Sequence, residues 1–149
     1  MQRPTSILLF ERLYLTAWVV SVVLGILNWS AGLAAVMAQP SIARIRGATA
    51  LMPSIYPVVH LLIWAGWVLL WYLVARRGSR VARILVTIFA LVAAYDGVGV
   101  LLAVLAGPLA GWSATMALVE AALVIAAAAM LFRPDARRWF SDRASRVVV

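Results

Sequence analysis

Four long runs of apolar residues, separated by short polar segments, dominate the chain. They cover residues 7–38, 55–75, 84–106 and 114–132. A helix needs about 20 mostly apolar residues to cross the hydrocarbon core of a bilayer, and the four runs have roughly that length or more. The pattern therefore predicts an all-α protein, a four-helix transmembrane bundle. With 149 residues in total, we expect a single membrane domain over residues 1–149.

The composition agrees with this class. Sixty-six per cent of the residues are hydrophobic and the mean hydropathy is +1.02, whereas roughly half of the residues of a soluble domain are apolar. The chain has no Cys, which excludes disulfides, thiol catalysis and thiolate metal sites. The lipid bilayer is thus the first partner that the sequence predicts.

The distribution of Arg predicts the orientation of the bundle. All thirteen basic residues are Arg, and eleven of them lie on one side of the predicted topology, in the two terminal segments and in the 76–83 turn. The opposite side has only Arg44 and Arg46. Cytoplasmic loops of membrane proteins carry an excess of basic residues. We therefore expect both termini in the cytoplasm (N-in/C-in), and the same rule accounts for the net charge of +8 without a nucleic-acid partner.

The C-terminal segment has a pattern of its own. Pro134 suits the first turn of a helix, and Trp139 and Phe140 stand among several Arg. This arrangement predicts a short C-terminal amphipathic surface helix that lies on the membrane with its aromatic side toward the lipid.

Asp96 lies roughly halfway along the third apolar run, beside Tyr95. A carboxyl group in the middle of a transmembrane helix costs about 2.5–3.5 kcal/mol on insertion scales. At about 1.5 Å per residue, Asp96 and Asn28 lie roughly 15 Å from the outer ends of their spans, and Glu120 and His60 roughly 8–9 Å. The sequence therefore predicts a polar pocket in the outer half of the bundle, closed toward the cytoplasm by apolar packing.

Two interpretations of this polar layer remain open. Ionisable residues inside a membrane commonly mark an ion or proton pathway or a ligand site, and an acid near His60 suits proton exchange at physiological pH. In the alternative, Asp96 stays protonated and only bonds a backbone carbonyl, Asn28 or a partner chain.

Two stripes with helical spacing predict which faces of the helices pack. The first run carries a stripe of small or polar residues that consists of Ser21, Gly25, Asn28 and Gly32, and the second run carries a bulky stripe that consists of His60, Trp64, Trp67 and Trp71. Small residues allow close helix packing in lipid. For Trp64, Trp67 and Trp71 the sequence leaves open a lipid-facing or inter-subunit face and an aromatic wall of a ligand site.

The sequence identifies no cofactor. A haem with two axial His ligands would need two copies of the chain, because His60 is the only His. A zinc site with three protein ligands would need His60, Asp96 and Glu120 together. No hydrolase signature or dinucleotide-binding loop is present. The cofactor, pigment or lipid that fills the site therefore stays unknown.

Both ends of the chain resemble a known class of proteins. The segments 3–7 (RPTSI), 10–14 (FERLY) and 131–140 (LFRPDARRWF) are similar to those of short four-span bacterial inner-membrane proteins that mostly lack an assigned function. The resemblance implies a bacterial inner-membrane location and supplies no catalytic residue.

We therefore expect a non-enzymatic membrane protein that binds or moves a small solute, an ion or a proton through the outer-half site. The surplus of Trp and the small-residue faces favour a homo-oligomer. Alternatives are an accessory subunit that packs against a larger membrane complex and, third, an enzyme that acts on a lipid.

Overall fold

The computed structural model describes residues 3–45, 47–107 and 111–144. Within them the chain is helical, without strands. The helices are α1 (Thr5–Leu27), α2 (Trp29–Met37), α3 (Pro40–Ala43), α4 (Ala48–Ala75), α5 (Arg80–Leu105), α6 (Trp112–Met130) and α7 (Pro134–Ala144). Arg46 and most of the turn between α5 and α6 lie outside the described residues.

Four of the helices are long and apolar enough to cross a membrane: Thr5–Leu27, Thr49–Ala75, Arg80–Leu105 and Trp112–Met130. This confirms the predicted all-α fold with four membrane-spanning helices, and the chain is a multi-pass membrane protein. Each of these helices satisfies its own backbone hydrogen bonds, which the bilayer interior requires.

The first helix ends earlier than the apolar pattern predicts. The residue at the break is Asn28, with a φ of −100° and a ψ of 17°. Its side-chain amide donates a hydrogen bond of 3.0 Å to the carbonyl of Leu24. A side chain that competes for a carbonyl of the preceding turn is a recognised cause of helix kinks. The run 7–38 therefore forms two helices, α1 and α2.

The second spanning helix begins earlier than predicted, because residues 48–54 belong to α4 and not to a linker. Gly47 precedes it with a φ of +82°, a left-handed conformation that Gly adopts without steric cost. Both Pro53 and Pro57 lie inside α4. Prolines are tolerated in membrane helices, since neighbouring groups and local adjustments satisfy the freed carbonyls.

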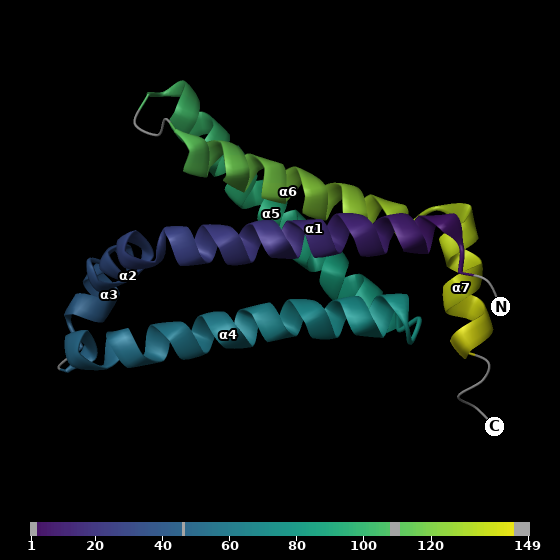
Figure 1. Ribbon diagram of the computed structural model, residues 1–149, viewed down its shortest axis with the longest axis horizontal. Coiled ribbons are helices and arrows are strands. Elements are labelled where there is room, and N and C mark those ends of the chain that lie inside the picture. Colours follow the sequence, from purple (N-terminus) through teal and green to yellow (C-terminus); the bar gives the residue numbers. More distant parts are fainter. Residues whose placement is uncertain (1–2, 46, 108–110, 145–149) are drawn as a thin grey trace.

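The spanning helices form two hairpins, α1 with α4 and α5 with α6, and α1 lies between α4 and α6 (Figure 1). Helix α1 packs against α6 on one side and α4 on the other, and α5 packs mainly against α6. Both termini, the α4–α5 turn and α7 lie at one end of the bundle, which we call the terminal end. The far end carries α2, α3, the end of α5 and the start of α6, and α4 diverges from α5 and α6 toward it (Figure 1).

The buried core occupies the terminal half of the bundle. It extends from Ile7 and Phe140 at the terminal end to a layer formed by four residues, one on each spanning helix: Ala17, Trp67, Ala90 and Val124. We call this layer the floor. The Trp67 ring packs between those of Tyr14 and Phe89, with ring centroids 5.2 and 4.6 Å away. Among the described residues, Ala114 is the one buried apolar residue beyond the floor.

Helix α7 covers the terminal end. The N–H of Ser6 donates a hydrogen bond of 3.1 Å to Asp135 Oδ2, so a carboxylate of α7 caps the first turn of α1. The indole N–H of Trp139 donates to the carbonyl of Val74 at 3.3 Å, and Phe140 is 2% exposed. The sequence predicts that the aromatic side chains of α7 face the lipid. In the structure, Trp139 and Phe140 pack on the bundle itself. The bonds of Asp135 to Ser6 and of Trp139 to Val74 hold α7 in this position.

Candidate functional site

Glu120 lies beyond the floor, on α6, and lines two cavities at once. One cavity opens between α5 and α6, and the other between α1, α4 and α6. Helices α5 and α6 approach closely at this level, since a Cβ on Gly97 would lie 3.2 Å from the Cβ of Ala121. Small residues allow such backbone approach in membrane bundles. The approach brings the carboxyl group of Glu120 beside α5.

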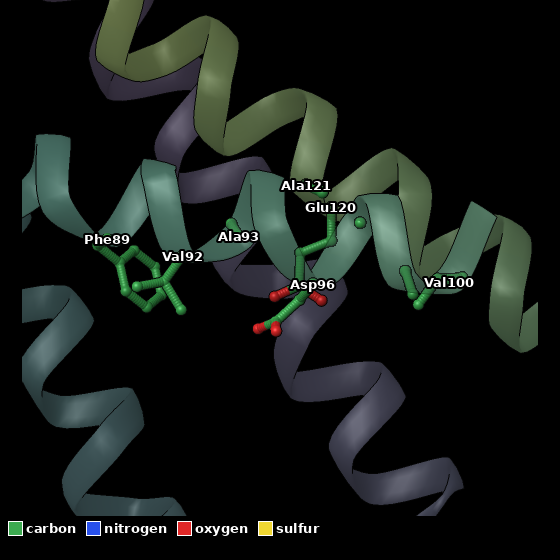
Figure 2. A pocket seen from close by; sticks show the side chains of 9 residues that line it. Phe89, Val92, Ala93, Asp96, Val100, Glu120 and Ala121 are labelled. Carbon is green, nitrogen blue, oxygen red and sulfur yellow. The ribbon is translucent and has the colours of Figure 1, made fainter. Parts of the chain in front are cut away.

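The acid cavity, between α5 and α6, has a volume of about 220 Å³. Asp96 and Glu120 both line it, and Figure 2 shows their side chains extending from neighbouring helices into the same space. The remaining walls are apolar and include Phe89, Val92 and Val100. Two carboxyl groups in apolar surroundings repel one another when both are ionised. The arrangement therefore suits a shared proton or a bound cation.

The polar cavity, between α1, α4 and α6, has a volume of about 370 Å³ and is lined by several polar groups of the far half. These are Ser21, Asn28, His60, Ser113 and Glu120. The Ser113 hydroxyl donates a hydrogen bond of 3.4 Å to Asn28 Oδ1, and the Ser21 hydroxyl bonds the Glu120 carboxyl. Glu120 thus has hydroxyl, amide and imidazole groups on the side of the polar cavity. On the side of the acid cavity it has Asp96.

His60 has a defined hydrogen-bonding state. Its Nδ1 atom lies 3.0 Å from the carbonyl oxygen of Tyr56. A carbonyl oxygen only accepts hydrogen bonds, so Nδ1 carries the hydrogen, and Nε2 of the neutral ring keeps a free lone pair. The ring packs among those of Tyr56, Trp29 and Trp64, at centroid distances of 4.2, 5.4 and 5.9 Å. These contacts hold the His60 ring in place on the wall of the polar cavity.

The aromatic stripe of α4 has different environments along its length. Trp64 lines the polar cavity, as the ligand-wall interpretation requires. Trp67 lies in the protein core, and Trp71 packs against that core with a buried indole N–H that has no hydrogen-bond partner among the described groups. The stripe is thus a packing face at the terminal end and a cavity wall only beyond the floor.

The stripe of small or polar residues on α1 and α2 faces the aromatic side chains of α4. A Cβ on Gly25 would lie 2.8 Å from Trp64 Cζ2, and a Cβ on Gly32 would overlap the Tyr56 hydroxyl. The indole N–H of Trp18 donates to the carbonyl of Trp64 at 3.1 Å. Glycines on one helix thus make room for rings on the other, which fixes the wall of the polar cavity.

The structure brings together most of the residues that the sequence predicts. Asp96 joins Glu120 in the acid cavity, and Asn28 and His60 join Glu120 in the polar cavity. Tyr95 lines neither cavity and is 81% exposed. It neighbours Asp96 in the sequence, but adjacent helical residues do not share a face.

The site also contains three residues that the sequence did not indicate: Ser113, Trp29 and Tyr56. Ser113 precedes the predicted fourth span by one residue, and Trp29 follows the unforeseen kink at Asn28. The sequence offered one signal for these residues: the hydroxyl of Ser113, at the start of the fourth span. In the described residues no three His, Asp or Glu side chains lie close enough together to hold a metal ion.

Comparison with known proteins gives no match: no family model, no curated protein and no solved structure matches the chain. The resemblance to short four-span inner-membrane proteins therefore stays a prediction.

Proposed function

We propose that this protein is a non-enzymatic membrane protein that binds a proton or a small cation at the Asp96–Glu120 pair and moves it through the outer half of the bundle. The observation that carries the proposal is the position of Glu120 on the walls of both cavities. A group that faces two compartments is able to accept a cation from one and release it to the other.

The chemistry of the pair supports this proposal. An ionised carboxylate in a membrane segment is costly, and a second one nearby adds repulsion. A proton shared by the two groups, or a cation held between them, offsets both effects. On the polar cavity side, the Nε2 lone pair of a neutral His60 ring and the hydroxyl oxygen of Ser21 supply hydrogen-bond acceptors, which a hydrated proton or cation needs.

The packing of the bundle supports a direction for access. We propose that the protein lies in the bacterial inner membrane with both termini in the cytoplasm, as the Arg distribution favours. The packed half then lies toward the cytoplasm, and the floor closes the site on that side. The polar cavity opens toward the extracytoplasmic side, from which the ion or proton enters.

A homo-oligomer belongs to the proposal. Helix α5 is the least buried of the spanning helices. The side chains of Tyr95 and Asp96 are both exposed on it. Polar groups in a membrane almost always face protein or water. A second copy that packs on α5 covers them and completes the wall of the acid cavity.

The test is flux into liposomes that contain the purified full-length protein and a pH-sensitive dye, under imposed proton, sodium or potassium gradients. The wild type is expected to carry one of these ions faster than protein-free liposomes. Glu120→Gln and Asp96→Asn each lower the flux by at least about tenfold, because a hydrogen bond to a charged group is worth about 1.5–3 kcal/mol. Glu11→Gln is the matched control, since Glu11 pairs with Arg3 at the terminal end. Flux that is unchanged in Glu120→Gln, or no flux above the protein-free level, contradicts the proposal.

The exposed face of α5 also favours a second candidate function, an accessory subunit of a larger membrane complex. In that case a different protein covers Tyr95 and Asp96. Asp96→Asn would then impair assembly and leave no ion flux to measure. Chemical cross-linking in native membranes, followed by purification, separates the two: the first proposal predicts multiples of the 16.2 kDa chain, and the second predicts a product with another protein.

A further inference from the structure

A third cavity lies at the terminal end, far from the carboxyl pair. It has a volume of about 360 Å³ and is formed by the start of α5, the end of α6 and α7. Its lining combines three arginines with two aromatic rings: Arg80, Arg83, Arg137, Phe132 and Phe140. We call it the arginine pocket. Arginine is the residue that best binds phosphate groups, because its planar guanidinium donates several hydrogen bonds at once.

Arg83 is held in place by the aromatic rings of the pocket. Its guanidinium carbon lies 5.6 Å from the ring centroid of Phe132 and 5.1 Å from that of Phe140. Contacts of this kind are attractive for a cation and fix the plane of the guanidinium. Arg80 and Arg137 are exposed at the rim. Three positive groups thus surround one cavity, and one of them is preoriented.

No carboxylate neutralises these three arginines among the side chains that the structure describes. The ion pairs found there join Glu11 to Arg3 and to Arg76. Three like charges around a common space repel one another. An anion in the pocket removes this repulsion.

The start of α5 adds to the same field. Ser79 caps the helix by accepting a hydrogen bond of 3.2 Å from the N–H of Ala82, and the first turn has no acidic residue. Arg80 and Arg83 stand at the positive end of the helix dipole, where anions are favourable and cations are not. The placement of the two arginines is therefore unfavourable for the helix alone and favourable for the binding of an anion.

The surroundings of the pocket indicate what the anion is attached to. Below the rim, Ile84, Ile88 and Leu91 follow Arg80 on one face of α5, and all three are exposed. Phe132 is also 47% exposed. An apolar face that begins at a phosphate-binding rim suits acyl chains that continue from a phosphate head group. Basic pockets between membrane helices are known to bind such head groups.

We propose that the arginine pocket binds the phosphate of an anionic phospholipid, with the acyl chains along Ile84 and Ile88 in the terminal half of α5, apart from the surface around Tyr95 that a second copy covers. Arg83, fixed by its two aromatic neighbours, provides the central contact, and Arg80 and Arg137 close the rim. Because the pocket shares no residue with the acid or polar cavity, this proposal stands independently of the proposed ion site.

The experiment is native mass spectrometry of the full-length protein in mild detergent. It is titrated with phosphatidylglycerol and with phosphatidylcholine of the same acyl chains. The wild type is expected to bind phosphatidylglycerol more tightly, and Arg80→Gln/Arg137→Gln to lower that affinity by about fivefold for each arginine removed. This double variant leaves the packing of Arg83 intact. Adding Arg83→Gln to the double variant lowers the affinity for phosphatidylglycerol further. Arg44→Gln, at the far end, is the matched control and leaves this affinity unchanged.

Four results would overturn the proposal. The first is equal affinity of the wild type for the two lipids, and the second is an affinity for phosphatidylglycerol that the double variant retains. The third is binding of inorganic phosphate that displaces phosphatidylglycerol at millimolar concentration, which would make free phosphate the occupant. A loss of affinity in Arg44→Gln equal to that of the double variant would also contradict a defined site.

Discussion

Replacing Gly25 by Ala tests the helix contact that forms the wall of the polar cavity. The new Cβ would lie 2.8 Å from Trp64 Cζ2, a distance that real Cβ contacts essentially never show. The Trp64 ring also packs on His60, so it has to shift toward the polar cavity, or α1 has to move away from α4, to admit the new Cβ. Overpacking of this kind costs about 1–3 kcal/mol, whereas Gly to Ala inside a helix gains about 0.5–1 kcal/mol.

Gly66→Ala is the matched control, because Gly66 lies inside α4 and a Cβ there meets nothing within 4 Å. Both variants gain the same helix propensity, so their difference isolates the clash. We expect Gly25→Ala to be less stable than Gly66→Ala by about 1–3 kcal/mol. Reversible unfolding by sodium dodecyl sulfate in mixed micelles measures both free energies. Equal stability of the two variants would refute the packing of α1 on Trp64.

Two further predictions concern the contact between α7 and α1 and the exposed face of α5. The hydrogen bond from the backbone N–H of Ser6 holds the pKa of Asp135 below its usual range. Asp135 therefore stabilises the fold above about pH 4 and loses this effect as the pH falls through its lowered pKa. Unfolding measured from pH 7 to pH 3 should show this loss in the wild type and not in Asp135→Ala; equal curves would contradict it. Because the chain has no Cys, Tyr95→Cys should form a disulfide-linked dimer on mild oxidation if a second copy covers α5. Leu69→Cys, exposed on α4, is the control, and equal cross-linking of both variants would count against that interface.

Much of the fold follows from the length and spacing of apolar runs. Four runs predict four spanning helices because the bilayer demands about 20 apolar residues and leaves few other structures possible. The helix boundaries were harder to predict. Asn28 looks like one polar residue in a continuous run, but in the structure the helix ends there and the Asn28 side chain bonds the Leu24 carbonyl. Likewise, Pro53 indicates a linker in a soluble protein but lies inside α4.

The candidate site was predictable in depth but not in rotation. Counting residues from the span ends places Asn28, His60, Asp96 and Glu120 in one half of the bundle. In the structure, the first three line cavities that Glu120 also lines. The division into two cavities depends on how α5 and α6 cross, which sequence periodicity does not determine. Tyr95 faces away from its neighbour Asp96 for the same reason: at about 3.6 residues per turn, one step turns a side chain to another face.

The most direct measurement for the proposed ion site is labelling with dicyclohexylcarbodiimide, an apolar reagent that reacts with protonated carboxyl groups. The labelled residue is located by mass spectrometry of the digested protein. We predict a label on Glu120 or Asp96 at neutral pH, because the proposed site would hold a proton between the two carboxyl groups when no cation is bound. We also predict slower labelling at higher pH and in the presence of the transported cation. Labelling confined to Glu11 or Asp135, or labelling of the pair that neither pH nor cations change, would contradict a protonatable ion-binding pair.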